Sequence, residues 1–511
     1  MSRNLAFPDQ RLKRNFRLLT YTAHVRRLLN PKLFWVRLTI AGLVIASFES
    51  WEIARPSFWA DEVATIAASH RSLPQLIHML STIDAVHGSY YLLIHVLGNL
   101  FGFTPFALRL PSSLAVATTA VVMALVAKKV FGERLAWFTL LITALLPRLV
   151  WAATEARSYG IDALLTATVL LLFLHILDAS GRRLKWLWVG YTFLVILDAH
   201  FFIYSLLVAG SHGVWLLWQN RKLFRQWLLS MVVTVATSAF IITWVLIEKD
   251  QVGWLPPLGP TTIDEIFVGQ AFWGNPNLAY LANGLILALL AGAVNPARLI
   301  APDQRKFIVL AGGMVLVPPA IILVASLLSS PIYDSRYFTM TAPMVALLLA
   351  VALESLFTRR SSLVALLLVL ALSVPTYFRF RETAAKGTHW EQVAAAIYRV
   401  EKPGDGILFT DYDRKSPSQS RIMIAYPSMV SDLTDLTQIR PYQRAEGLYP
   451  KRAKVTQVTA RFKSHRRILV LHESDEKREY DQVAAVLKAR GFGFEKRIRV
   501  VRSWISIFVR K

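Results

Sequence analysis

The sequence contains no cysteine among its 511 residues. This absence excludes disulfide bonds, thiolate metal sites and thiol catalysis, although it does not identify the redox compartment. We also find no internal repeat and no glycine-rich loop that could cradle a phosphate. Acidic residues are scarce, 33 against 57 lysines and arginines, so the net charge is +24. This excess favours anionic lipids, phosphates or acidic polymers as neighbours, and we expect no nucleic-acid partner because much of the charge lies in short loops.

Apolar residues, in contrast, make up 54% of the chain, which includes 15 tryptophans. Many apolar runs reach the roughly 20 residues that a helix needs to cross a bilayer. The sequence therefore predicts a mainly α-helical, multi-pass membrane protein. Residues 1–33 form a basic tail, and the apolar run 34–51 is typical of an uncleaved signal anchor whose basic end stays in the cytoplasm.

The charge of the loops indicates how many spans there are and which side of the membrane each loop faces. Tyr90–Phe103 is apolar but only about 14 residues long, so we expect it to lie along the membrane surface. The expected spans are then eleven: 34–51, 108–127, 135–153, 159–177, 185–199, 201–218, 226–247, 277–294, 307–329, 338–357 and 362–378. With this assignment the basic loops all lie inside, whereas a crossing at Tyr90–Phe103 would place them all outside.

Two segments are then expected outside the membrane. The first is the loop 52–106, with short amphipathic helices at Ala64–Ser69 and Leu73–Leu80. The second is the tail 379–511, which has 27 basic and 15 acidic residues. Its patterns predict a small α/β domain, with helices at His389–Val400 and Tyr480–Arg490 and strands at Gly406–Thr410, Ile468–His472 and Ile498–Val509. The basic residues of this domain could bind lipid headgroups or an anionic polymer, or they could simply be solvated at its surface.

Four sets of polar residues lie at the outer ends of the spans. Each alone fits a helix start or an interface residue. When the topology is chosen from loop charge alone, all four sets lie on the same side of the membrane. This agreement favours a functional site at the membrane surface. The sets are Asp61, Glu62 and His87; Glu155 to Tyr159 with Asp162; His200; and Ser335 to Tyr337.

Several motifs, in order, resemble a known group of enzymes. They are Phe58-Trp59-Ala60-Asp61-Glu62, His87-Gly88-Ser89-Tyr90-Tyr91, Ala107-Leu108-Arg109-Leu110-Pro111-Ser112, Lys128-Lys129-Val130-Phe131-Gly132 and Glu155-Ala156-Arg157-Ser158-Tyr159. This order resembles the GT-C superfamily of integral membrane glycosyltransferases, within bacterial glycosyltransferase family 39. That family includes protein O-mannosyltransferases and the aminoarabinose transferase. The resemblance covers about 55–378; one departure is Gly88, where many relatives have proline.

The resemblance implies a bacterial plasma-membrane enzyme with a polyprenyl-phosphate-linked sugar as donor. A mannose, other hexose or pentose would be transferred with inversion to a hydroxyl of a lipid, glycan or protein at the outer face. Asp61 matches the catalytic carboxylate, Arg336 matches a phosphate-binding arginine, and no obligatory metal or other cofactor is expected. The other expected donor or acceptor contacts are Glu62, His87, Tyr91, Arg157, Tyr159, Asp162, His200 and Tyr337.

Two alternatives remain open from the sequence. A transporter or flippase of lipid-linked sugars could use the same residues as a pathway. An inactive homologue could use the basic outer domain to bind an anionic envelope polymer. The gathering of the polar sets at one face favours surface chemistry over transport.

Overall fold

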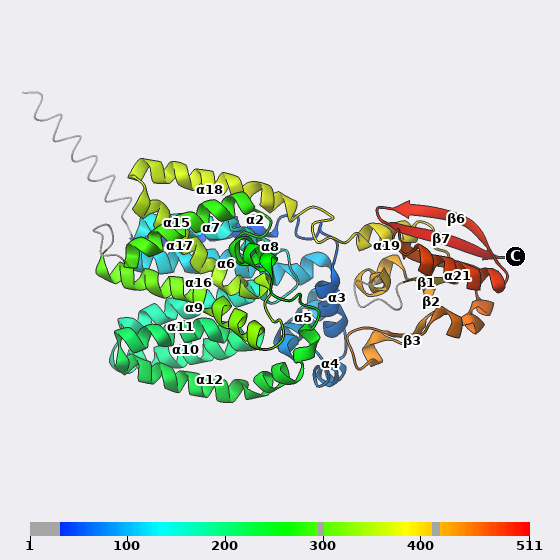
Figure 1. The fold of residues 1–511 in the computed structure, drawn as a ribbon, viewed down its shortest axis with the longest axis horizontal. Helices are drawn as coiled ribbons and strands as arrows, with labels where there is room; N and C mark the ends of the chain where they lie inside the picture. The colour runs from blue at the N-terminus through cyan, green and yellow to red at the C-terminus, as the bar shows by residue number, and fades with distance from the viewer. Residues whose placement is uncertain (1–30, 295–300, 411–418) are drawn as a thin grey trace, which may run out of the picture.

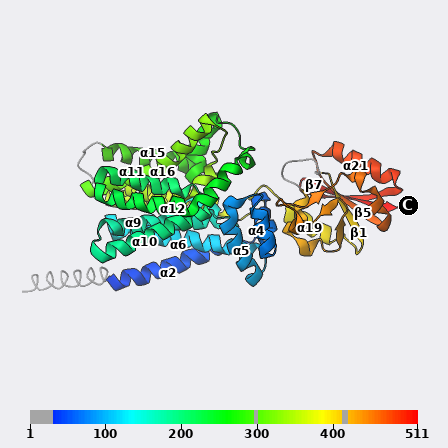
Figure 2. The same ribbon diagram turned by 90° about the horizontal axis from the view of Figure 1, so that it is seen from below.

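The structure is a computed structural model that describes residues 31–294, 301–410 and 419–511. Three layers follow one another along its long axis: a helical bundle, the short helices of the first outer loop, and a C-terminal α/β domain (Figures 1 and 2). The predicted fold class, a helical membrane bundle with a small C-terminal α/β domain, is confirmed. Almost all of the predicted basic tail 1–33 lies outside the described residues.

Helices coincide with each of the eleven predicted spans. Their bounds are Pro31–Ser50 (α2), Pro105–Phe131 (α6), Glu133–Leu145 (α7) with Pro147–Ala153 (α8), Tyr159–Leu177 (α9), Gly181–Phe201 (α10), Ser205–Gln219 (α11), Arg221–Ile247 (α12), Pro276–Val294 (α15), Pro302–Leu328 (α16), Ser335–Thr341 (η4) with Ala342–Leu356 (α17), and Arg359–Arg379 (α18). Among the described residues, seven helices are long and apolar enough to cross a membrane, and the bent pair α7–α8 makes an eighth if the two helices form one span. This pair bends by 58° where Pro147 begins α8. The number of eleven spans stays a prediction.

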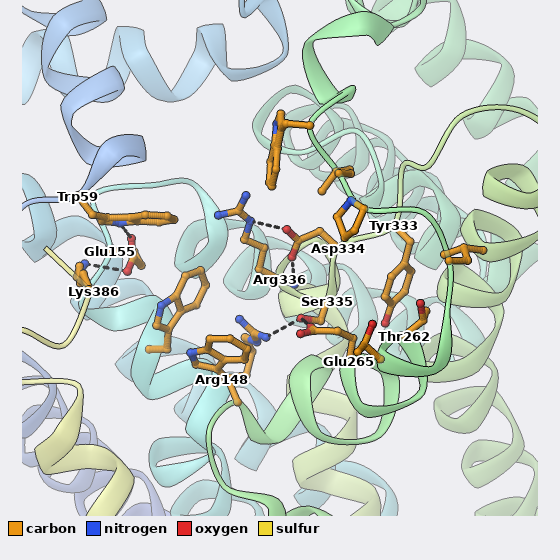
Figure 3. A pocket seen from close by; sticks show the side chains of 18 of the residues that line it. Trp59, Arg148, Glu155, Thr262, Glu265, Tyr333, Asp334, Ser335, Arg336 and Lys386 are labelled. Atoms are coloured by element: carbon orange, nitrogen blue, oxygen red, sulfur yellow. Dashed lines mark hydrogen bonds and ion pairs between the residues drawn. The ribbon is translucent and has the colours of Figure 1, made fainter. Parts of the chain in front are cut away.

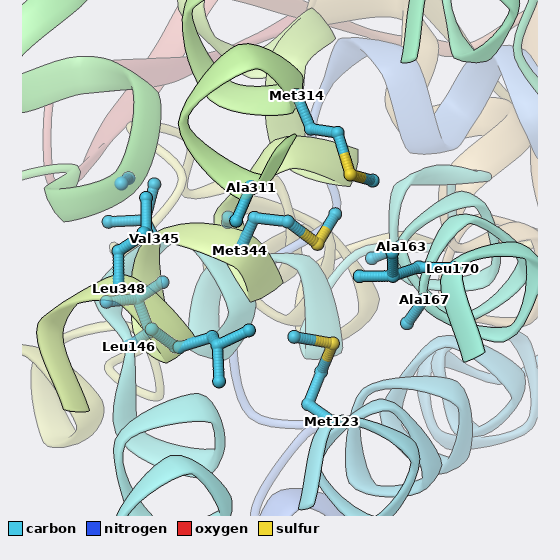
Figure 4. Packing of buried hydrophobic residues seen from close by; sticks show 14 of the residues in the cluster. Met123, Leu146, Ala163, Ala167, Leu170, Ala311, Met314, Met344, Val345 and Leu348 are labelled. Atoms are coloured by element: carbon cyan, nitrogen blue, oxygen red, sulfur yellow. The ribbon is translucent and has the colours of Figure 1, made fainter. Parts of the chain in front are cut away.

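The bundle packs around α17, in which every residue from Ala342 to Leu353 is buried. Figure 4 shows Met344 of this helix among other buried residues, including Met314 and the pair Ala163 and Ala167 of α9. Those two alanines are four residues apart and so lie on one face of α9, and small side chains let membrane helices approach closely. Large apolar side chains remain exposed along α2, α12 and α18, as expected of helices that face lipid.

The first outer loop folds into three helices, Ala60–Ser69 (α3), Leu73–Leu80 (α4) and Gly88–Phe101 (α5). The helix α4 has its predicted bounds, whereas α3 begins four residues earlier than predicted. The helix α5 has 14 residues, fewer than a full crossing needs. It lies with α3 and α4 between the bundle and the C-terminal domain, in agreement with its interpretation as a surface helix (Figure 1).

The C-terminal domain is built on a five-stranded sheet of order β2-β1-β5-β7-β6. The strand β1 is parallel to both of its neighbours, whereas β7 is antiparallel to β5 and β6. The elements are Trp390–Tyr398 (α19), Asp405–Phe409 (β1), Ile422–Ala425 (α20), Leu433–Asp435 (β2), Gln438–Arg440 (β3), Lys451–Arg452 (β4), Arg467–Glu473 (β5), Lys477–Ala489 (α21), Phe492–Val500 (β6) and Ser503–Arg510 (β7). The segment Ile498–Val509, in which strand structure is predicted, contains the end of β6 and most of β7, joined at Val501 and Arg502.

Reporter fusions test the orientation that the loop charges predict. A reporter that fluoresces only in the cytoplasm should stay dark when it is fused after Lys511, because the C-terminal domain is expected outside. The same reporter inserted at Gly132, in a loop with basic residues on both sides, should fluoresce. Fluorescence after Lys511 together with darkness at Gly132 would reject this orientation.

Candidate active site

Asp61 and Glu62 are neighbours in the first turn of α3 but point in different directions, because successive helical residues are rotated by about 100°. Carboxylates in this turn suit the positive end of the helix. The Asp61 side chain is 25% exposed and its Oδ2 lies 3.1 Å from Nη1 of Arg336. The Glu62 side chain is completely buried. Of these two neighbours, Asp61 therefore presents the carboxylate that a substrate can reach.

Glu62 is enclosed by cations. Its two oxygens each accept a 2.7 Å hydrogen bond from Arg109, and Oε1 also lies 3.1 Å from Nζ of Lys386. The backbone N–H of Ala156 adds a fourth contact, at 2.9 Å. Burial alone would raise the pKa of Glu62, but the two cations outweigh burial and lower it. These contacts hold α3 against the bundle and Lys386, while the expected substrate contact by Glu62 stays a prediction.

Lys386 joins a second buried carboxylate to this network. Its Nζ lies 2.8 Å from Oε1 of Glu155, whose other oxygen accepts a 2.7 Å hydrogen bond from the indole of Trp59 (Figure 3). Burial raises the pKa of Glu155, Lys386 opposes that rise, and the charge of Glu62 adds to it, with a net value of about 7. This network fixes Trp59, the residue that directly precedes α3.

Arg336 comes from η4, at the start of the tenth expected span. Besides Asp61, its guanidinium contacts Asp334, with Nε 3.1 Å from Oδ2. It also lies 5.5 Å from the centre of the Trp59 ring and 5.3 Å from that of Trp254. Aromatic faces stabilise a cation at such distances and fix its position. The ion pair thus joins segments 275 residues apart in the chain.

A cavity of about 540 Å³ opens beside this ion pair. Arg336 and Trp59 form part of its wall, and Arg148 and Lys386 add two further cations (Figure 3). Much of the remaining wall is apolar or aromatic, from Trp151, Trp254, Leu255, Pro256, Pro257, Leu258, Trp273 and Tyr333. Three carboxylates also line the cavity, with Glu155 paired to Lys386 and Asp334 paired to Arg336; the third is Glu265. A cavity with cations and apolar walls suits a ligand that combines an anionic group with an apolar part.

Arg157 lies at the centre of a second polar group. It donates to the hydroxyl of Tyr91 at 3.1 Å and to Nε2 of His87 at 2.9 Å. The Tyr91 hydroxyl in turn donates to Asp84. Burial lowers the pKa of His87, and Arg157 lowers it further, so this imidazole is held neutral as an acceptor. Asp61 interacts electrostatically with both His87 and Arg157, so this group borders the exposed carboxylate.

Two of the predicted aromatic residues lie close to this centre, while two polar residues lie apart from it. Tyr159 and Tyr337 both pack on Phe202, at 6.0 and 5.7 Å between ring centres. Asp162 is fully buried inside the bundle and interacts with Asp198 instead of with Asp61. His200 contacts the carbonyl of Ile196 in its own helix. The structure therefore brings together parts of three of the four predicted sets and leaves Asp162 and His200 outside the cluster.

Sequence reasoning did not identify several residues that the fold brings to this centre. Lys386 follows the last span, Trp254 lies in a long outer connection, and Asp84 precedes the His87 motif by three residues. None belongs to a local pattern that indicates chemistry. Among the described residues there is no group of three or more histidines, aspartates or glutamates placed to hold a metal ion.

Comparisons with known proteins can now be set beside this geometry. Residues 89–246 match the family model described as dolichyl-phosphate-mannose-protein mannosyltransferase. The fold is similar to the crystal structure of apo ArnT from Cupriavidus metallidurans, with a TM-score of 0.61, 16% identity, and coverage of 94% of this chain and 98% of ArnT. The ArnT structure bound to undecaprenyl phosphate gives a TM-score of 0.60, 14% identity and the same coverage. No curated protein sequence matches the chain significantly.

These matches agree with the geometry on two points. The ArnT likeness spans nearly the whole of both chains, from the bundle to the C-terminal domain. The family match begins at Ser89, inside the motif that carries His87 and Tyr91, and it includes Arg157. The predicted resemblance is thus confirmed: the chain has the ArnT fold and resembles the GT-C glycosyltransferases of family 39.

Proposed function

We propose that this protein is a membrane glycosyltransferase that uses a polyprenyl-phosphate-linked sugar and glycosylates a hydroxyl at the outer face of the bacterial plasma membrane. The observation that carries the proposal is the Asp61–Arg336 pair beside a cavity with cationic and apolar walls. The match to a mannosyltransferase family and the likeness to an ArnT structure that holds undecaprenyl phosphate support it. Mannose is one candidate for the sugar, along with other hexoses and pentoses.

Asp61 acts as the general base in this proposal. An acceptor hydroxyl gives its proton to the Asp61 carboxylate while its oxygen attacks the anomeric carbon. The bond from that carbon to the phosphate oxygen breaks on the opposite side, and the lipid phosphate leaves with the electron pair. Attack opposite to the leaving group inverts the anomeric centre.

Arg336 binds the lipid phosphate, because a guanidinium offers planar donors that match phosphate oxygens. Its carboxylate partners in the structure are Asp61 and Asp334. A phosphate that takes over Arg336 would leave Asp61 without its countercharge and ready to accept a proton. Arg157 would provide further positive charge from the other side, with His87 and Tyr91 holding it in place.

Replacing Arg336 by alanine should weaken the binding of undecaprenyl phosphate by about 10- to 150-fold. This range corresponds to the loss of about 1.5–3 kcal/mol from a hydrogen bond to a charged group. Titration of the purified wild type and variant with undecaprenyl phosphate measures the two affinities. Arg490→Ala is the matched control, because Arg490 is exposed at the end of α21 in the C-terminal domain and its replacement should leave binding unchanged. Equal affinities in the wild type and Arg336→Ala would remove Arg336 from the donor site.

The function as a whole is tested in a strain that lacks the gene. Mass spectrometry of its envelope glycans and lipid-linked sugars should reveal a missing sugar on the acceptor and an accumulated polyprenyl-phosphate donor. Restoration of the gene should reverse both changes. Unchanged glycans and donor levels would contradict the proposal.

A further inference from the structure

The C-terminal domain packs directly on the segment that carries Asp61. One hydrophobic core continues from Phe58 and Val63 in this segment to Trp390 and Leu469 in the domain. The hydroxyl of Tyr426 accepts a 2.9 Å hydrogen bond from the backbone N–H of Phe58. Helix α20 packs against α3. The outer domain is therefore part of the wall around the catalytic segment.

A loop of this domain, residues 442–449, follows the outer helices toward Asp61. The buried Arg71 of the first outer loop donates hydrogen bonds to two carbonyls of this loop, those of Tyr442 at 2.6 Å and Gly447 at 2.7 Å. At its end, the hydroxyl of Tyr449 donates to the carbonyl of Ala60 at 3.3 Å. The Tyr449 hydroxyl is thus bonded to the residue that directly precedes Asp61.

Arg421 stacks on this tyrosine. The central carbon of its guanidinium lies 4.3 Å from the centre of the Tyr449 ring. Tyr449 interacts electrostatically with Arg421, Asp61 and Asp84, so its hydroxyl is near the catalytic carboxylate as well as the cation. Tyr449 therefore links a cation of the outer domain with the edge of the active site.

The guanidinium of Arg421 lacks the partners that a buried cation needs. Its Nε and Nη1 are both buried, and neither has a hydrogen-bond partner among the residues that the structure describes. Buried N–H donors without partners cost free energy, more so when they carry charge. The aromatic face of Tyr449 offsets only part of this cost. An anionic ligand that supplies oxygens to Nε and Nη1 would offset the rest.

Arg421 lies in a different part of the molecule from Arg336, the residue assigned to the donor. The donor phosphate is assigned to Arg336, which enters from the membrane bundle beside the cavity. Arg421 instead belongs to the C-terminal domain, outside the bundle. In the described part of this domain, no helix is long and apolar enough to cross a membrane beside a polyprenyl tail. Since the domain that carries Arg421 is expected outside the membrane, we expect a ligand of Arg421 to come from the aqueous side.

We infer that Arg421 binds an anionic group, a phosphate or a carboxylate, on the acceptor and so helps to select which hydroxyl reaches Asp61. This inference rests on the proposed function. Arg421 is then a specificity-determining residue that the outer domain contributes, with Tyr449 as its support. The domain would recognise the acceptor while the bundle holds the donor.

The first test measures anion binding without catalysis. The purified full-length protein is saturated with undecaprenyl phosphate, so that the Arg336 site is occupied, and titrated with radiolabelled inorganic phosphate at constant ionic strength. Arg421→Gln should weaken phosphate binding at least tenfold, whereas Arg421→Lys should retain most of it. Arg444→Gln is the control, because Arg444 is an exposed arginine in the loop 442–449 that carries Tyr449; its phosphate binding should stay within twofold of the wild type. Absence of phosphate binding to the wild type, or equal binding to Arg421→Gln, would overturn the inference.

The second test measures transfer in the complemented deletion strain. Arg421→Gln should lower the glycan product about tenfold while the affinity for undecaprenyl phosphate stays within twofold of the wild type. A normal product level would show that the anion site does not serve the acceptor, and a loss of donor affinity equal to that of Arg336→Ala would assign Arg421 to the donor. Failure of the wild type to bind undecaprenyl phosphate would contradict the proposed function, while the phosphate titration would still report on Arg421.

Discussion

Replacing Asp61 by asparagine is expected to lower turnover by about 100-fold or more, because an amide cannot accept the proton of the acceptor hydroxyl. Glu62 cannot substitute for it, since both of its oxygens are buried and bonded to Arg109. The affinity for undecaprenyl phosphate should be at least as high as in the wild type, because Arg336 loses one of the two carboxylates, Asp61 and Asp334, that compete with the phosphate. Turnover is measured as sugar transfer from the polyprenyl-phosphate donor.

The fold should survive this change. Asparagine and aspartate stabilise a helix N-terminus to a similar degree, so α3 should still form. Asp264→Asn is the matched control, because Asp264 is exposed in an outer connection and its replacement should leave turnover unchanged. Near-normal turnover in Asp61→Asn would show that this carboxylate only supports local structure.

Replacing Glu62 by glutamine should destabilise the protein by about 3–5 kcal/mol, the usual cost of removing one partner from a buried ion pair. The change leaves two buried cations, Arg109 and Lys386, without this carboxylate. Arg109 would still donate to the carbonyls of Ile53 and Pro56, which cannot neutralise its charge. Thermal unfolding in detergent measures the loss as a lower midpoint.

An exposed pair in the same connection provides the control. Glu52 pairs with Arg55 at 2.8 Å, and its side chain is 36% exposed. Glu52→Gln should change stability by no more than about 1 kcal/mol, since such pairs contribute little in water. If Glu62→Gln melted like Glu52→Gln but lost activity, Glu62 would have to contact the substrate, as the sequence alone had indicated.

The sequence predicts the helices of the bundle well because hydrophobic length and loop charge are local properties. Tyr90–Phe103, for example, is too short to cross, and the structure has a 14-residue helix, α5, in that region. The sequence predicts strand structure over Ile498–Val509 but does not mark the hairpin of β6 and β7, because the turn at Val501 and Arg502 lacks the usual glycine or asparagine.

The candidate site was predictable only in part, because its partners are distant in the chain. A motif can mark Asp61 and Arg336 as separate candidates, but the 3.1 Å contact between them depends on the packing of the whole bundle. Adjacent carboxylates also look alike in a sequence, and only the structure shows that Glu62 is enclosed while Asp61 is open. Lys386 carries no local signal, since a single lysine after a span usually lies in solvent.

The contact of Lys386 with Glu62 and Glu155 has a consequence for biogenesis. Synthesis proceeds from the N-terminus, so both carboxylates are made long before Lys386, which follows the last span. Until this lysine has been translated and docked, the two glutamates share only the charge of Arg109. We therefore expect the segment that carries Asp61 to reach its final form only after the last helix has been inserted.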